Sequence, residues 1–114
     1  MPIEAPKMDV TTLKALAEPN RLAIIELLRE SPLTVGEITD QIKLSQPHTS
    51  KHLKVLSDCG IVKVHAKANR RYYKLRPEPF QSLESWIKSF QGIMEERFDN
   101  LDRLLKELKD EGEF

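Results

Sequence analysis

The sequence predicts a mainly helical domain that contains one small β-hairpin, an α+β class. Apolar residues recur three and four positions apart through much of the chain, which is the spacing of amphipathic helices. One pair of β-rich runs, 61–67 and 71–75, interrupts that pattern. The 114 residues suit a single domain, and 32% charged against 6% aromatic residues is typical of amphipathic helices.

Two helices are expected at the beginning, after a loose arm over residues 1–8. The first covers about 9–17. Pro19 suits the first turn of the second helix. The backbone amides of a first turn have no hydrogen-bond partner within the helix, so the missing amide hydrogen of proline loses no bond there. The apolar residues of this second helix form one stripe, and Ser31-Pro32 ends it.

A helix-turn-helix is expected next. Thr34 and Glu37 have the spacing of a capping box and open a short helix that ends near Leu44. Ser45 is a suitable N-cap for the following helix, which Gly60 can stop in a left-handed conformation. One side of that helix is apolar, and the other is polar and basic. The residues of the polar side are Gln46, Pro47, Ser50, Lys51 and Lys54.

The β-rich runs 61–67 and 71–75 predict a hairpin, with Asn69 suited to the positive φ that a tight turn requires. A basic hairpin after a helix-turn-helix is a wing, so the fold expected is a winged helix-turn-helix with the element order α-α-α-α-β-β-α. Pro77 ends the hairpin, and one long helix is expected over 77–114 as part of the same domain as the winged helix-turn-helix, 9–76.

Positive charge is concentrated in residues 45–76, which hold eight basic residues and one acid, a net charge of +7. Residues 1–44 carry −2 and residues 77–114 carry −5, so the formal net charge of the chain is zero. A cationic face on a neutral chain attracts phosphate electrostatically. We therefore expect double-stranded DNA as a partner.

Several other classes of protein are not expected. Cys59 is the only cysteine, which excludes an internal disulfide and a zinc site built from cysteine pairs. The chain has no apolar run of about 20 residues and no signal peptide at residues 1–8, so a cytoplasmic location without membrane contact is expected. It also has no phosphate-cradling glycine loop and no nucleophile–histidine constellation, so we expect no enzyme and no cofactor.

The run over residues 44–56, LSQPHTSKHLKVL, followed by GIV at 60–62, resembles the recognition helix of the ArsR/SmtB family of bacterial repressors. Residues 16–22, LAEPNRL, resemble the entry into that family's second helix, and residues 70–75, RRYYKL, resemble its wing. The resemblance covers roughly 10–76. It implies a homodimeric winged-helix repressor whose first and last helices form the dimer interface.

Some residues depart from the family's pattern. Thr49 stands where an apolar residue is usual, Cys59 where alanine is usual, and Asn69 where glycine is usual. Sensors of the family often carry Cys-x-Cys before the recognition helix, or Asp and His ligands along the last helix. Residues 34–40 lack cysteine and the expected last helix lacks histidine, so the resemblance implies a member that binds no metal.

The DNA contacts are expected on the recognition helix and the wing. Gln46 is the candidate for base reading, since its amide can pair with adenine in two places. The hydroxyls and lysines are expected to hold phosphates, and Arg70 or Arg71 to enter a minor groove. The predicted DNA-binding residues are Thr34, Ser45, Gln46, Pro47, His48, Ser50, Lys51, Lys54, Lys67, Asn69, Arg70 and Arg71.

An apolar stripe from Leu83 to Leu108 predicts homodimerisation. It spans about 38 Å of helix, longer than a domain of this size needs to cover its own core. Trp86 and Phe90 are expected to be its anchors. The predicted interface residues are Leu13, Leu16, Leu83, Trp86, Ile87, Phe90, Met94, Phe98, Leu101 and Leu105.

Alternatives remain open. His48 and His52, four apart on one helix, could chelate zinc, and Cys59 could be a redox switch; packing and DNA contact are the simpler roles. The chain could be a ligand- or metal-responsive repressor, or a winged-helix module that binds proteins and not DNA. The sequence identifies neither an operator nor a small-molecule or protein inducer.

Overall fold

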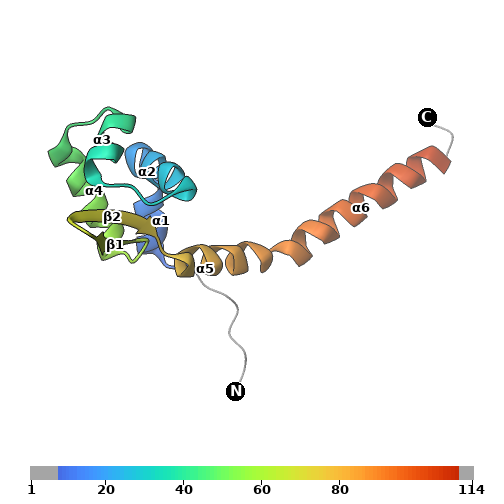
Figure 1. The fold of residues 1–114 in the computed structure, drawn as a ribbon. Coiled ribbons are helices and arrows are strands. Elements are labelled where there is room, and N and C mark those ends of the chain that lie inside the picture. The colour runs from blue at the N-terminus through green and yellow to red at the C-terminus, as the bar shows by residue number, and fades with distance from the viewer. Residues whose placement is uncertain (1–7, 111–114) are drawn as a thin grey trace, which may run out of the picture.

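A computed structural model describes residues 8–110 and contains six helices and one two-stranded antiparallel sheet within that range (Figure 1). This confirms the predicted fold class. The arm expected over residues 1–8 falls almost wholly outside the described residues. The elements are α1 (Val10–Leu16), α2 (Pro19–Glu30), α3 (Val35–Ile42), α4 (Gln46–Asp58), β1 (Val62–Lys67), β2 (Arg70–Leu75), α5 (Pro77–Lys88) and α6 (Gln91–Asp110).

The helix starts agree with their sequence signals. The amide of Glu37 donates to the Thr34 hydroxyl at 3.2 Å, and the amide of Thr34 donates to the Glu37 carboxylate at 3.0 Å, so α3 has the predicted capping box. The amide of His48 donates to the Ser45 hydroxyl, which caps α4. Gly60 follows α4 with a φ of 74°, the left-handed stop that was expected.

The buried core lies between the first four helices and the base of the hairpin. Thr49 is fully buried in this core, although an apolar residue would be usual there. Its hydroxyl donates to the backbone oxygen of Ser45 one turn earlier at 3.0 Å, so the buried polar group is paired. The largest fully buried side chains are Ile24, Ile38, Leu53, Leu56, Ile61 and Thr49.

The hairpin is joined to the helical body by a further backbone bridge. Leu33 and Tyr73 exchange two hydrogen bonds, with N···O distances of 3.1 and 2.7 Å. These bonds attach β2 to the segment just before α3. The wing is therefore held beside the helix-turn-helix. Its position is fixed by this bridge as well as by the hydrogen bonds between its two strands.

The turn of the hairpin differs from the sequence-based expectation. Ala68 has the positive φ, 58°, whereas Asn69 does not, so the placement of the left-handed residue at Asn69 was wrong. Only Ala68 and Asn69 separate the two strands, and a tight turn of this kind can require the unusual φ at its first central residue. The Cβ of alanine makes that conformation unfavourable by about 1 kcal/mol.

The single helix expected over 77–114 is divided in the structure into α5 and α6 by a turn at Ser89 and Phe90. The Ser89 hydroxyl donates to the backbone oxygen of Trp86, and the Phe90 amide donates to the backbone oxygen of Ile87, three residues back, at 3.1 Å. A hydroxyl bound to the backbone and a turn tightened to three residues both interrupt an α-helix. The apolar stripe crosses this turn, so periodicity alone does not reveal it.

The molecule is elongated because α6 extends away from the body. Figure 1 shows α5 leading out from the base of the hairpin and α6 continuing beyond it with no other element alongside. The radius of gyration is 21.1 Å, against about 13 Å for a compact chain of this length. None of the described helices combines the length and apolar character that crossing a bilayer requires.

Candidate nucleic-acid interface

Helix α4 has the two-sided character that the sequence predicts. Thr49, Leu53 and Leu56 are buried on its inner side. Gln46 and Lys51 are exposed on its outer side. The predicted DNA-binding residues are all exposed except Thr34, which is half-buried. The outer side of α4 is therefore accessible to a groove of duplex DNA.

The start of α4 is organised by Ser45 and His48. Besides accepting from the His48 amide at 3.3 Å, the Ser45 hydroxyl lies 2.9 Å from Nδ1 of the His48 ring. This contact occupies Nδ1, so Nε2 is the ring nitrogen of His48 that stays accessible to a partner. The cap also holds Gln46 and Pro47 in the first turn of the helix, at the exposed end of the recognition surface.

His52 points to a different partner from His48. Its Nδ1 lies 3.8 Å from a carboxylate oxygen of Glu18, the residue that caps α2 by accepting from the Arg21 amide. The two imidazoles thus use Nδ1 in separate local contacts. Among residues 8–110, no three His, Cys, Asp or Glu side chains lie close enough together to hold a metal ion. That the protein binds no metal remains a prediction.

Thr34 and the wing tip lie on neighbouring elements. The Thr34 amide and hydroxyl, which donate to the Glu37 carboxylate, hold the pKa of that carboxyl below its usual value, and the charge of Arg70 acts in the same direction. Arg70 is the first residue of β2, a strand that contacts α3. Arg71 is exposed on the opposite face of the hairpin.

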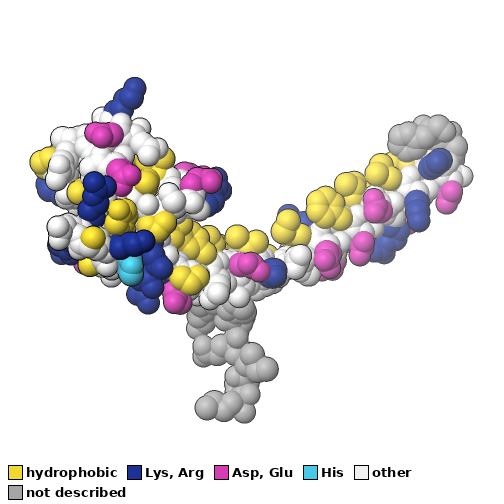
Figure 2. Space-filling model, viewed as in Figure 1, with side chains coloured by type: hydrophobic (Ala, Val, Ile, Leu, Met, Phe, Trp, Pro, Cys, Tyr) yellow, Lys and Arg dark blue, Asp and Glu magenta, His cyan; other side chains and the backbone are white. Residues whose placement is uncertain are grey.

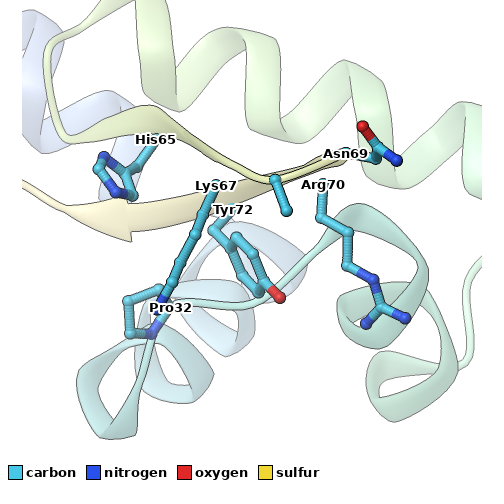
Figure 3. A pocket seen from close by; sticks show the side chains of 7 residues that line it. Pro32, His65, Lys67, Asn69, Arg70 and Tyr72 are labelled. Atoms are coloured by element: carbon cyan, nitrogen blue, oxygen red, sulfur yellow. The ribbon is translucent and has the colours of Figure 1, made fainter.

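A groove lies on the outward face of the hairpin and was not predicted from the sequence. It has a volume of about 690 Å³. Figure 3 shows side chains of the hairpin projecting toward Pro32, which precedes α3. Strand alternation could have identified this shared face, because every second residue of a strand points the same way. The lining residues are Pro32, His65, Lys67, Ala68, Asn69, Arg70 and Tyr72.

Cys59 caps the end of α4, half-buried and packed against the core. This is the packing position that the sequence indicates. A structural thiol of this kind needs no redox role to explain its place.

Comparison with known proteins identifies the class of this fold and surface. The family model described as "Bacterial regulatory protein, arsR family" matches residues 18–64. The transcriptional repressor SdpR of Bacillus subtilis is 31% identical over 77 residues, which are 68% of this chain and 86% of SdpR. The structure of HlyU, a transcriptional activator of Vibrio cholerae, has a TM-score of 0.59 and 36% identity, covering 66% of this chain and 83% of HlyU.

A crystal structure of an ArsR family transcriptional regulator has a TM-score of 0.66 and 30% identity, and the match covers 75% of this chain and 89% of that one. The fold and its exposed basic helix thus define a winged-helix DNA-binding transcriptional regulator. The chain belongs to the arsR family of bacterial regulatory proteins. That family consists of transcriptional regulators and not of enzymes, as the sequence led us to expect.

Proposed function

We propose that the chain acts as a homodimeric repressor that binds an operator with inverted-repeat symmetry. The observation that carries the proposal is the pairing of an exposed, basic recognition helix with a basic wing on a chain that also exposes a long apolar helix face. In this proposal α4 enters a major groove and the wing tip enters the flanking minor groove. Two copies are then needed to read both halves of the repeat.

Support for the dimer comes from the apolar side of α5 and α6. Phe98 is 63% exposed and Leu101 is 50% exposed, values that are unusual for large apolar side chains that lie side by side. Figure 2 shows hydrophobic side chains running along one side of α6, with charged side chains beside them. A second copy of the chain would cover this stripe.

The remaining predicted interface residues fall into two groups. Leu16 packs against the core of its own chain and Leu13 is half-buried, so α1 offers a smaller area to a partner. Trp86 and Phe90 contact each other edge to face, with ring centroids 5.3 Å apart, where α5 meets α6. In the proposed dimer this aromatic pair lies at the end of the apolar surface that is nearest the body.

Each predicted DNA contact has a proposed task. Gln46, in the first turn of α4, reads a base edge in the major groove, most favourably adenine. Lys51 and Lys54 bind phosphates, as do Ser45, Thr34 and Lys67, and these contacts position the protein without specifying sequence. His48, Ser50, Pro47 and Asn69 complete the contact surface.

Repression is proposed because an operator that overlaps a promoter would be occluded by the bound dimer, and SdpR is a repressor of the same family. The fold alone does not decide this, because HlyU is an activator. A regulator of the chromosome acts in the cytoplasm of a bacterium. The inducer, whether small molecule, metal ion or protein, is the open part of the proposal, and a change in operator affinity on adding a candidate would identify it.

The test is selection of bound sequences from a random duplex library at about 150 mM salt, where screening suppresses non-specific binding. Enrichment of an inverted repeat is the expected result. Failure of folded protein to enrich any sequence would overturn the proposal. That result would favour the alternative in which the basic face binds an acidic protein.

A further inference from the structure

The outward face of the hairpin carries no acidic side chain. Successive residues of a strand alternate between faces, and the register therefore places three cross-strand pairs on this one face. Val62, on the opposite face, is buried in the core together with Leu53 and Leu56 of α4. The outward face thus points away from the recognition helix. Its pairs are Lys63–Lys74, His65–Tyr72 and Lys67–Arg70.

This arrangement works against the stability of the hairpin. Lys63 lies directly opposite Lys74 and Lys67 directly opposite Arg70, and like charges in that position destabilise an antiparallel pair. Residues 60–76 contain no acid, and the ion pairs found among the described residues include none of the basic side chains of β1 or β2. A face that concentrates repelling charges fits an anionic partner that neutralises them.

We propose that this outward face binds the sugar-phosphate backbone of the duplex that flanks each operator half-site. The inference rests on the proposed function, because it takes the position of the DNA from α4 and the wing tip. With the tip in the minor groove beside the half-site, the duplex that continues away from the dyad passes on the side of the hairpin opposite to α4. A bend toward the protein brings its backbone onto Lys63, Lys67 and Lys74.

The groove beside the tip provides a matching shape. Figure 3 shows Lys67 and Tyr72 projecting from the hairpin on the side where Pro32 lies, with Arg70 farther along the same groove. A concave recess of about 690 Å³ can receive the convex ridge of a DNA backbone. Lysine, arginine, asparagine and tyrosine side chains all donate hydrogen bonds to phosphate oxygens, and the groove contains one of each.

The experiment compares two duplexes that carry the operator obtained by selection. The short duplex ends just beyond the position of the wing tips, and the long duplex has about 10 additional base pairs at each end, one helical turn. The wild-type protein should bind the long duplex more tightly and with a steeper dependence on salt. End-to-end energy transfer on the long duplex should also increase on binding, because the flanks bend toward the protein.

The double variant K63Q/K74Q should lose most of this advantage, because Lys67 and the groove residues are left in place. If each lysine neutralises one phosphate in each protomer, its loss lowers the salt slope by about 0.9 per contact and weakens binding by roughly fivefold per contact at 0.15 M salt. Removing the repelling pair should leave the hairpin at least as stable as before. The matched control is K106Q/K109Q on α6, which makes the same charge change outside the hairpin.

The outcomes separate the two proposals. Equal affinities and equal salt slopes of the wild-type protein on the short and long duplexes would overturn this inference and leave operator recognition intact. A preference for the long duplex that is undiminished in K63Q/K74Q would also overturn it. If no operator is enriched in the selection, the proposed function fails, and this inference fails with it.

Discussion

At the scale of single residues, the start of α4 shows how local hydrogen bonding prepares the recognition surface. Ser45 caps the helix with its hydroxyl, while its backbone oxygen accepts from the buried Thr49. These bonds satisfy backbone groups of the first turn, and Gln46 extends from that hydrogen-bonded turn. Rigid presentation is what a base contact needs, because bidentate pairing tolerates little displacement.

Gln46→Ala should relax specificity at one base pair of each half-site. The lost bidentate contact corresponds to about 1–3 kcal/mol of discrimination, or roughly 5- to 150-fold. Competition between the selected operator and duplexes substituted at single positions measures this. Lys51→Gln is the control, since losing a phosphate contact should weaken all sequences alike. Undiminished discrimination by the Gln46→Ala protein at every position would rule out its assigned role.

Arg71→Ala should weaken operator binding and reduce the salt slope by about 1 for each wing that loses a contact. Arg71 is the sharper choice for this experiment because it is exposed on the opposite face of the hairpin from Arg70 and does not line the groove. Affinity measured across a salt series gives both quantities. A slope identical to that of the wild-type protein would show that Arg71 does not reach the DNA.

At the scale of elements, the helix starts and the sidedness of α4 could be predicted from the sequence, because caps and buried stripes are local signals. The turn at Ala68 could not, because the residue that takes a positive φ depends on how the two strands are brought into register. The turn at Ser89 was hidden for a related reason. The apolar spacing continues across it, and the break is marked by hydrogen bonds of the Ser89 hydroxyl and the Phe90 amide that form only in the folded turn.

The capping box of α3 should make stability depend on pH. The pKa of Glu37 is lowered in the folded protein by hydrogen bonds from Thr34, and then by Arg70. A lowered pKa contributes stability that is present above the ordinary value of about 4.5 and is lost as pH falls through the lowered value. Urea unfolding at pH 7 and at about pH 3 should therefore show a smaller difference in Glu37→Gln than in the wild-type protein.

Thr34→Ala serves as the companion variant for that measurement. Removing an N-cap hydroxyl lowers the free energy of unfolding by about 0.5–2 kcal/mol. The loss should appear at pH 7 and shrink at low pH, because a protonated Glu37 gains less from the cap. If both variants retain the full pH dependence of the wild-type protein, the box does not couple stability to pH.

At the scale of the whole molecule, the body and α6 differ in how far their apolar side chains are covered. The first four helices and the hairpin enclose a core of their own, whereas α6 has large apolar side chains exposed along its length. The sequence could predict that stripe from its spacing, but not the shared outward face of the hairpin. That face depends on cross-strand register, which brings residues such as Lys63 and Lys74 together from opposite ends of the hairpin sequence.

Leu101→Glu should dissociate the proposed dimer. A carboxylate placed in an apolar interface without a partner costs roughly 3 kcal/mol, which raises the dissociation constant about 100-fold. Sedimentation across a concentration series measures this, and the fluorescence of Trp86, the only tryptophan, reports on the interface. Asn100→Glu, on another side of α6, is the control and should remain dimeric. Equal dissociation constants for the two variants would place the interface elsewhere.

The most direct test of the proposed mechanism is the mass of the complex that forms on the selected operator at saturation. We predict that each duplex gains twice the 13.2 kDa mass of one chain, and that disrupting one half-site weakens the binding of both copies. Saturation by a single chain, with specificity for the full repeat retained, would contradict the proposal that two recognition helices read one inverted repeat.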